Sequence, residues 1–329
     1  MKQSLNAIRR TMRHLRSQKH SQALYPLLYT NDWSNDFEQP RWWSDFVNKA
    51  TDGKHASEIK LEWTSVFGPR WIHHVPRNRP VVFFSPEDTE YRYRQYDDYL
   101  AGYADLALGF KYRTNHQNYL RFPLWINYFI SSDCALDELR SSEITKFLDN
   151  VSSGVSEETF QREIFCSLIA SHDERGNGAG LRTAAGDQMG EIAPVHYEGR
   201  FRNNSARLKD EFNDDINSYL GNCTFNICLE NTNSPGYTTE KLFQALVNGA
   251  VPIYWGSCGN PEPEILTGNG IVYFDPDEPE NAMKTAKRLR SDSSFRAEFL
   301  SKPILQDSAH ACITETIEAA RTKILNLIS

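Results

Sequence analysis

The sequence lacks the features of a membrane-spanning or secreted protein. It contains no run of about 18 apolar residues, the minimum for a helix that crosses a bilayer, and its N-terminus has no apolar signal core. Its six cysteines form no C-x-x-C pair and show no metal-ligand spacing. We therefore expect a soluble, cytoplasmic protein whose cysteines are free thiols, several of them buried in apolar segments.

Two common phosphate-binding fingerprints are also missing. Neither G-x-x-x-x-G-K-[ST] nor G-x-G-x-x-G occurs, which argues against a P-loop NTPase and against a dinucleotide-dependent oxidoreductase. Lys and Arg number 36 against 43 Asp and Glu, giving a net charge of -7. This balance argues against general nucleic-acid binding as a function. No internal repeat or low-complexity tract is present.

The length of 329 residues predicts about two domains. In the first half we expect strands at 23–30, 59–63, 80–84 and 104–110, with a helical stretch at 91–100. This alternation of strands and helices predicts an α/β fold with doubly wound, mostly parallel sheets. The Ser- and Gly-rich segment VSSGVS favours a domain boundary after residue 155.

The most informative stretch runs from Thr224 to Ser257. It predicts a strand at 224–229, a loop at 230–238, a helix that ends near Gly249 and a second strand at 251–255. Thr239 is a plausible N-cap of the helix. Backbone N–H groups at a helix start and the nearby Lys241 suit an anion such as phosphate. On chemistry alone, an anion site and an ordinary βαβ unit both stay open.

The motifs in this stretch resemble those of a known family. Leu229–Asn231 (LEN), Gly236–Lys241 (GYTTEK) and Pro252–Ser257 (PIYWGS) are similar in type and spacing to the donor-binding signature of the α-1,3/4-fucosyltransferases, glycosyltransferase family 10. The resemblance implies the GT-B architecture, with two Rossmann-like domains facing a central cleft. It implies a soluble, bacterial-type member.

The implied domains are an acceptor-binding domain at 1–155, a GDP-sugar-binding domain at 156–305 and a C-terminal helix at 306–329 that packs back toward the first domain. The resemblance covers the second domain well and the first more thinly.

Glu87 is the general base that the resemblance implies, since it follows a predicted strand in SPEDTEYR. Asp88 and Glu90 are nearby competitors, and the acidic cluster could instead begin a helix at Tyr91.

Catalytic and donor-binding roles are implied for Lys241 and Arg182, with Arg175 as the rival of Arg182. An exposed helix arginine is the alternative for Arg182.

The resemblance further implies that Asn231, Tyr237 and Glu240 contact the donor, together with Lys241 and Arg182. The acceptor-binding residues stay undefined, with Trp33 and Arg121 as weak candidates. Trp42 and Trp43 either line the acceptor site or pack in the core.

A basic segment, Met1 to Ser21, has apolar residues at helical spacing. It either lies on an anionic membrane surface or packs on the protein.

The function implied is an inverting, metal-independent transferase that moves L-fucose from GDP-β-L-fucose to an oligosaccharide hydroxyl. The linkage would be α-1,3 or α-1,4, and the product a surface glycan or lipopolysaccharide. Asp275 and Asp277 have a D-x-D spacing but precede a predicted helix, where they fit a cap better than a metal site. A transferase for another GDP-linked sugar and a non-catalytic sugar-binding protein on the same fold remain alternatives.

Overall fold

The structure is a computed structural model that describes residues 22–30, 39–67, 78–174 and 176–329. The chain divides into two compact units. Unit 1 comprises Met1–Phe122, Ser131–Arg140 and Thr316–Ser329, and unit 2 comprises Pro123–Ile130 and Ser141–Glu315. The boundary expected after residue 155 lies within unit 2; as functional domains, the ranges 1–155, 156–305 and 306–329 stay a prediction.

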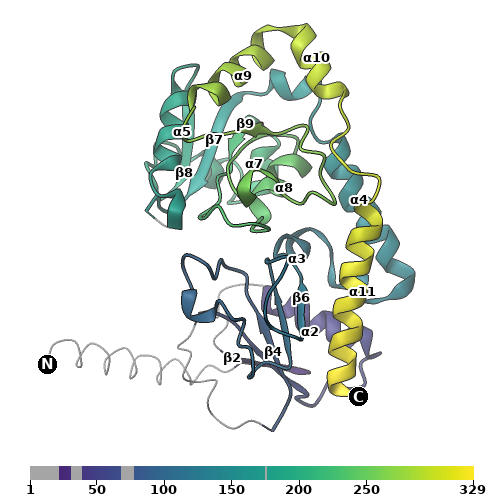
Figure 1. Ribbon diagram of the computed structural model, residues 1–329. Helices are drawn as coiled ribbons and strands as arrows, with labels where there is room; N and C mark the ends of the chain where they lie inside the picture. Colours follow the sequence, from purple (N-terminus) through teal and green to yellow (C-terminus); the bar gives the residue numbers. More distant parts are fainter. Residues whose placement is uncertain (1–21, 31–38, 68–77, 175) are drawn as a thin grey trace, which may run out of the picture. The chain divides into compact units, whose positions relative to one another are not determined.

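Unit 1 is built on a six-stranded sheet in which strands adjacent in the sequence are also neighbours (Figure 1). Its strands are β1 (Gln22–Leu24), β2 (Leu27–Thr30), β3 (Leu61–Thr64), β4 (Val81–Phe84), β5 (Leu106–Gly109) and β6 (Tyr119–Arg121). All pairs are parallel except β1 with β2. The single strand expected at 23–30 is therefore wrong: the chain turns at Tyr25–Pro26 and forms a hairpin, with Gln22 opposite Tyr29.

Only one turn of 3-10 helix, η3 (Arg94–Tyr96), forms where the sequence predicted a helix at 91–100. Tyr99 and Leu100 adopt positive φ angles of 51° and 56°, which a continuing right-handed helix does not allow. Tyr99 is buried and packs edge-on against Phe83 of β4, so core packing decides the backbone here.

The helices of unit 1 include α2 (Gln39–Ala50), which carries Trp42 and Trp43 into the core. The Trp43 ring lies 4.5 Å from the ring of Trp63 and 4.8 Å from that of Phe122, measured between centroids. These two tryptophans therefore have the packing role that the sequence left open.

Unit 2 contains a five-stranded, fully parallel sheet in the order β11-β10-β9-β7-β8. Its strands are β7 (Ile164–Ala170), β8 (Val195–Gly199), β9 (Cys223–Ile227), β10 (Val251–Tyr254) and β11 (Val272–Tyr273). The chain adds β8 on one side of β7 and then returns to add β9 on the other. This reversal is the doubly wound order that the sequence predicted, and its switch point lies between β7 and β9.

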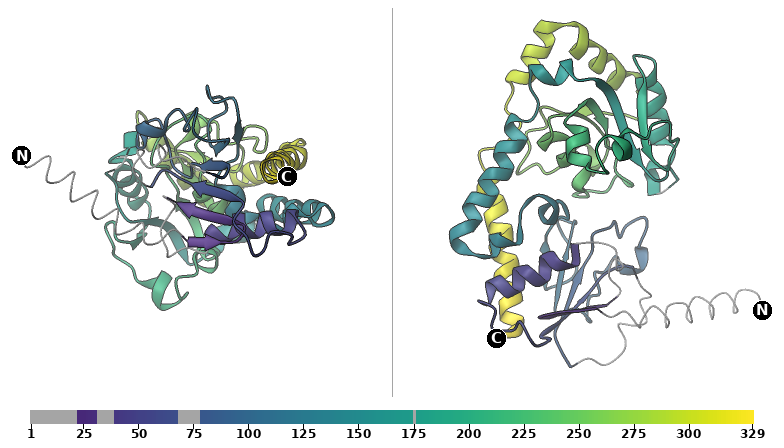
Figure 2. Two further views of the ribbon diagram at one scale, coloured as in Figure 1. Left: turned by 90° about the horizontal axis from the view of Figure 1, so that it is seen from below. Right: turned by 180° about the vertical axis from the view of Figure 1, so that it is seen from behind.

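Helices cover both faces of this sheet (Figures 1 and 2). The helices that carry residues of unit 2 are α3 (Trp125–Phe129), α4 (Asp137–Ser153), α5 (Leu181–Gly190), α6 (Arg207–Asp210), α7 (Ile216–Leu220), α8 (Glu240–Val247), α9 (Glu280–Ser291), α10 (Ser293–Ser301) and α11 (Ala309–Ile328). Buried side chains of α5 and α9 share one apolar core with the sheet. The helices α7 and α8 contact β9 and β10 outside that core.

The segment from β9 to β10 matches the sequence prediction closely. Thr239 is the N-cap of α8, and Leu242, Phe243 and Leu246 are buried. Gly249 has a φ of +69°, and its N–H donates to the Leu246 carbonyl at 3.0 Å. Glycine tolerates this left-handed conformation, which is why the helix ends where it does.

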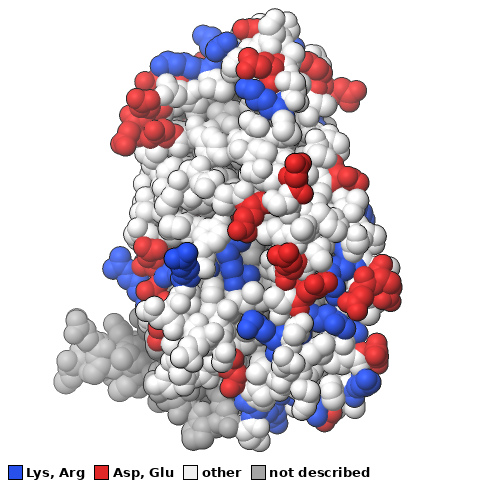
Figure 3. Space-filling view, turned by 45° about the vertical axis from the view of Figure 1, so that its right-hand side comes forward, with Lys and Arg blue, Asp and Glu red and all other residues white. Residues whose placement is uncertain are grey.

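Charged residues of both signs are mixed on one face of the molecule. On the face shown in Figure 3, acidic and basic side chains of the described residues lie interspersed. Among the described residues, no helix is both long enough and apolar enough to cross a membrane.

Candidate active site

The polar residues predicted for donor binding gather at one edge of the sheet in unit 2. In a doubly wound sheet, ligands bind beyond the carboxyl ends of the strands, at the switch point. Here that point lies between the loop after β7, from Ser171 to Gly180, and the loop after β9, from Cys228 to Thr239.

Arg182 bridges these two loops. It lies in the first turn of α5 and is 6% exposed. Its Nη1 donates to the His172 carbonyl at 3.1 Å, while Nη2 donates to the Leu229 carbonyl and to Asn231 Oδ1, both at 3.0 Å. The guanidinium is therefore buried at the switch point, and the exposed-helix alternative for Arg182 is wrong.

Asp173 anchors the start of the same helix. Its carboxylate accepts the backbone N–H groups of Arg182 and Thr183 at 3.0 and 2.8 Å, and the Thr183 hydroxyl at 2.7 Å. Gly180, with a φ of +83°, makes the turn into the helix. The first N–H groups of α5 therefore bind the protein's own carboxylate.

The glycine-bearing loop after β7 packs directly on the loop after β9. A Cβ atom at Gly178 would come within 2.7 Å of the Trp255 ring and 3.1 Å of the Glu230 carbonyl. Asn177 Oδ1 accepts the N–H of Asn233 at 2.8 Å. The close approach needs glycine, and it fixes the position of the loop that carries Asn231.

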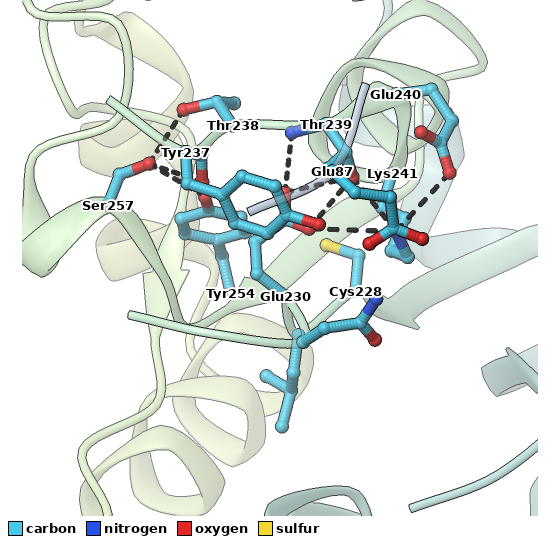
Figure 4. A network of polar contacts seen from close by, with 12 residues as sticks. Glu87, Cys228, Glu230, Tyr237, Thr238, Thr239, Glu240, Lys241, Tyr254 and Ser257 are labelled. Carbon is cyan, nitrogen blue, oxygen red and sulfur yellow. Dashed lines mark hydrogen bonds and ion pairs between the residues drawn. The ribbon is translucent and has the colours of Figure 1, made fainter. Parts of the chain in front are cut away.

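A buried network surrounds the start of α8 (Figure 4). Glu230 accepts the Thr239 N–H at 2.7 Å and the Thr239 hydroxyl at 2.8 Å. Lys241 Nζ lies 2.9 Å from Thr239 Oγ1, 3.3 Å from a Glu240 carboxylate oxygen and 3.6 Å from Glu230 Oε2. Lys241 is thus held among two carboxylates, with 27% of its side chain exposed.

Burial raises the pKa of Glu230 above its ordinary value of 4.5, and the nearby Lys241 charge opposes that rise.

The loop before α8 is tied to the loop after β10. The Ser257 hydroxyl donates to the Tyr237 carbonyl at 2.8 Å and lies 2.7 Å from the Thr238 hydroxyl. At Gly256 a Cβ atom would meet the Glu230 side chain at 2.6 Å. Tyr237 is buried, so its ring supports this loop from within.

Glu87 belongs to unit 1 and lies in the loop directly after β4, as the sequence predicted. It is buried, and its carboxylate pairs with Arg92 Nη1 at 2.8 Å. Asp88 accepts the Tyr91 N–H at 2.7 Å and so shapes the turn. No helix begins at Tyr91, which removes the helix-start alternative for this cluster.

Arg121 stands at the end of β6, where its Nε donates to the Phe110 carbonyl at 3.0 Å and its guanidinium lies over the Tyr112 ring. It therefore anchors the loop after β5. The remaining candidates, Trp33, Arg175 and the basic segment 1–21, lie outside the described residues.

Among the described residues, no group of three or more His, Cys, Asp or Glu side chains could hold a metal ion. Asp275 of the D-x-D pair accepts the N–H of Asp277 at 2.9 Å and so closes a local turn.

Sequence reasoning missed Asp173, Glu230 as a charged anchor and the full role of Thr239. The first two lie within three residues of the ends of β7 and β9. An acidic residue at that position in a parallel sheet is the signal that could have identified them.

Solved structures show which fold the chain has. The chain resembles an α1,3-fucosyltransferase solved with GDP-fucose, with a TM-score of 0.58 and 19% identity over 91% of this chain and 89% of the other. An α1,3-fucosyltransferase structure with GDP matches with a TM-score of 0.57 and 20% identity. The match covers 92% of this chain and 93% of the other. These likenesses confirm the GT-B fold that the resemblance implied.

A sequence relative and a family model point to the fucosyltransferases. The α-(1,3)-fucosyltransferase FucT of Helicobacter pylori is 27% identical over 199 residues, which cover 55% of this chain and 38% of that protein. The matched part thus spans well under half of the relative. Residues 161–299 match the model described as "Glycosyltransferase family 10 (fucosyltransferase) C-term". Residues 161–299 therefore resemble the C-terminal part of glycosyltransferase family 10, in agreement with the motifs that predicted this family.

Proposed function

We propose that this protein is an inverting fucosyltransferase that transfers L-fucose from GDP-β-L-fucose to a hydroxyl of an oligosaccharide acceptor. The observation that carries the proposal is the position of Arg182, Asn231 and Lys241 at the switch edge of a family 10 domain. The donor is named because a protein of similar fold was solved with GDP-fucose.

The chemistry explains why cationic groups belong at this edge. Breaking the bond between fucose C1 and the phosphate oxygen leaves negative charge on the β-phosphate of GDP. Arg182 and Lys241 supply positive charge there, and fixed charges of this kind stabilise a departing anion without reorganising. Asn231, Tyr237 and Glu240 complete the proposed donor contacts. Metal independence is part of the proposal, and turnover that EDTA leaves unchanged would support it.

Glu87 is the proposed general base. A carboxylate that removes the proton from the acceptor hydroxyl permits a single displacement at C1, which inverts the β-linked donor to an α-linked product. Its pairing with Arg92 keeps the carboxylate oriented. The proposed linkage is α-1,3 or α-1,4, and the proposed acceptors are surface glycans or lipopolysaccharide.

The site of action in this proposal is a reducing compartment such as the bacterial cytoplasm. All six cysteines are free, and four of them are buried.

The decisive experiment is a transfer screen with purified protein. GDP-fucose and other GDP-linked sugars are each offered with a glycan array, and products are read by mass spectrometry. Transfer of fucose supports the proposal, whereas transfer of another sugar alone identifies the family alternative. GDP binding without turnover on any acceptor would favour a non-catalytic sugar-binding protein.

A further inference from the structure

Glu230 is a fully buried carboxylate that the proposed chemistry does not use directly. It follows β9 by three residues, and its side chain is 0% exposed. An ionised carboxylate in such a position loses its hydration, which is destabilising unless hydrogen bonds and an opposite charge offset the loss. The groups that contact the Glu230 carboxylate therefore indicate its role.

The hydrogen bonds and the ion pair of the Glu230 carboxylate lead to the start of α8. Its oxygens accept both the backbone N–H and the hydroxyl of Thr239. The same hydroxyl is 2.9 Å from Lys241 Nζ, so Thr239 donates to Glu230 and accepts from Lys241 at once. Glu230, the Thr239 hydroxyl and the Lys241 ammonium thus form a continuous chain (Figure 4).

Lys241 supplies the positive charge at one end of this hydrogen-bonded chain, opposite the Glu230 carboxylate. The ionisable groups that face Glu230 are Lys241, Glu240, Cys228 and Tyr254. Of these only Lys241 is positive, and a lysine side chain has four rotatable bonds that would otherwise let the ammonium wander. Glu230 lies 3.6 Å from the Lys241 ammonium, and 27% of the lysine side chain stays exposed.

We propose that Glu230 is a positioning residue for the donor diphosphate, acting through Thr239 and Lys241. This inference rests on the proposed function. Glu230 itself does not touch the substrate; it holds the first turn of α8 and the ammonium where a departing GDP β-phosphate needs them.

A double-mutant cycle tests the proposal. Glu230→Gln keeps the shape and removes the charge, and Lys241→Ala removes the group that it positions. We expect Glu230→Gln to lower kcat by roughly 10- to 100-fold, the range found for groups that orient metal ligands. In the Lys241→Ala background, Glu230→Gln should lower kcat little further, because the ammonium through which Glu230 acts on the substrate is already absent.

A matched pair keeps the test decisive if Glu230→Gln fails to fold. Thr239→Val removes the relay hydroxyl and keeps the branched shape, while Thr239→Ser restores the hydroxyl. We expect Thr239→Val to lose kcat and Thr239→Ser to recover most of it. Glu198→Gln, which alters another buried glutamate of unit 2 on β8, should leave kcat and KM for GDP-fucose unchanged.

Three results would overturn the inference. They are additive losses in the Glu230 and Lys241 cycle, equal kcat values for Thr239→Val and Thr239→Ser, and a fall in melting temperature with no change in kcat. If the wild-type protein neither binds GDP in calorimetry nor transfers fucose, the proposed function fails and the inference fails with it. If the wild-type protein transfers fucose and the Glu230→Gln variant has the same kcat, the inference is refuted and the proposed function stands.

Discussion

Replacing Arg182 by lysine keeps the positive charge but removes the ability to donate hydrogen bonds to the loops after β7 and β9 at the same time. Arginine donates from Nη1 to the His172 carbonyl beyond β7, and from Nη2 to the Leu229 carbonyl and Asn231 beyond β9. A single ammonium can stay with one strand end and must leave the other. The lost contact is a hydrogen bond from a charged donor, worth about 1.5–3 kcal/mol.

This loss should appear in both stability and binding. For a domain of this size, 1 kcal/mol shifts the melting temperature by about 2–4 °C, so Arg182→Lys should melt roughly 3–12 °C lower. If the freed Asn231 loop also costs donor affinity by a similar energy, the Kd for GDP should rise about 10- to 100-fold. Differential scanning fluorimetry and titration calorimetry measure the two effects.

The matched control is Arg202→Lys. Arg202 lies just after β8 in the same unit, is 41% exposed and pairs with Asp187. Exposed pairs contribute little, so this variant should stay within about 0.5 kcal/mol of wild type. An Arg182→Lys protein that melts and binds GDP like wild type would show that the bridge between β7 and β9 does not hold the site.

Three further outcomes follow from unit 1. Glu87→Gln should lower transfer by roughly 10²- to 10⁴-fold, the contribution of a general base, while the protein stays folded. The exposed Glu90→Gln variant should transfer normally, and wild-type turnover in Glu87→Gln would remove Glu87 from the role of base. Gly109→Ala should destabilise unit 1 by about 1–3 kcal/mol in urea unfolding, because its Cβ would lie 2.3 Å from the Tyr99 ring, whereas Gly190→Ala, with nothing within 4 Å, should be neutral or stabilising. Burial raises the pKa of Tyr99 from 10.0 to about 12. The unfolded chain therefore releases this proton first, and stability falls as pH rises from about 10 to 12, by at most about 3 kcal/mol. Tyr99→Phe should show a shallower fall over that range in the same urea titrations, and an equal slope would contradict the assignment.

The sequence predicted those parts of the fold that depend on short-range pattern. The segment from β9 to β10 was predictable because apolar spacing, the Thr239 cap and the Gly249 stop all act within a few residues. The location of Glu87 was predictable for the same reason, since a buried strand ends immediately before it.

Contacts between segments that are distant in the sequence could not be predicted from the sequence pattern. The contacts of Arg182 with Leu229 and Asn231 depend on β9 lying beside β7, which pattern alone does not specify. The predicted helix at 91–100 failed because packing of Tyr99 overrode local preference. Lys241 was predicted as a cation near phosphate, but its ion pair with Glu230 becomes visible only in three dimensions.

The way unit 1 is assembled limits how the protein can be dissected. Its residues come from three separate stretches, the last of which is Thr316–Ser329. Within that unit, Arg140, which is almost fully buried, pairs with Glu318 at 2.8 Å. An expression fragment that stops after the first 155 residues would keep the Asp137 partner of this guanidinium and lose its Glu318 partner. Work on the N-terminal half should therefore start from the intact polypeptide, or from a circular permutant that keeps the final helix.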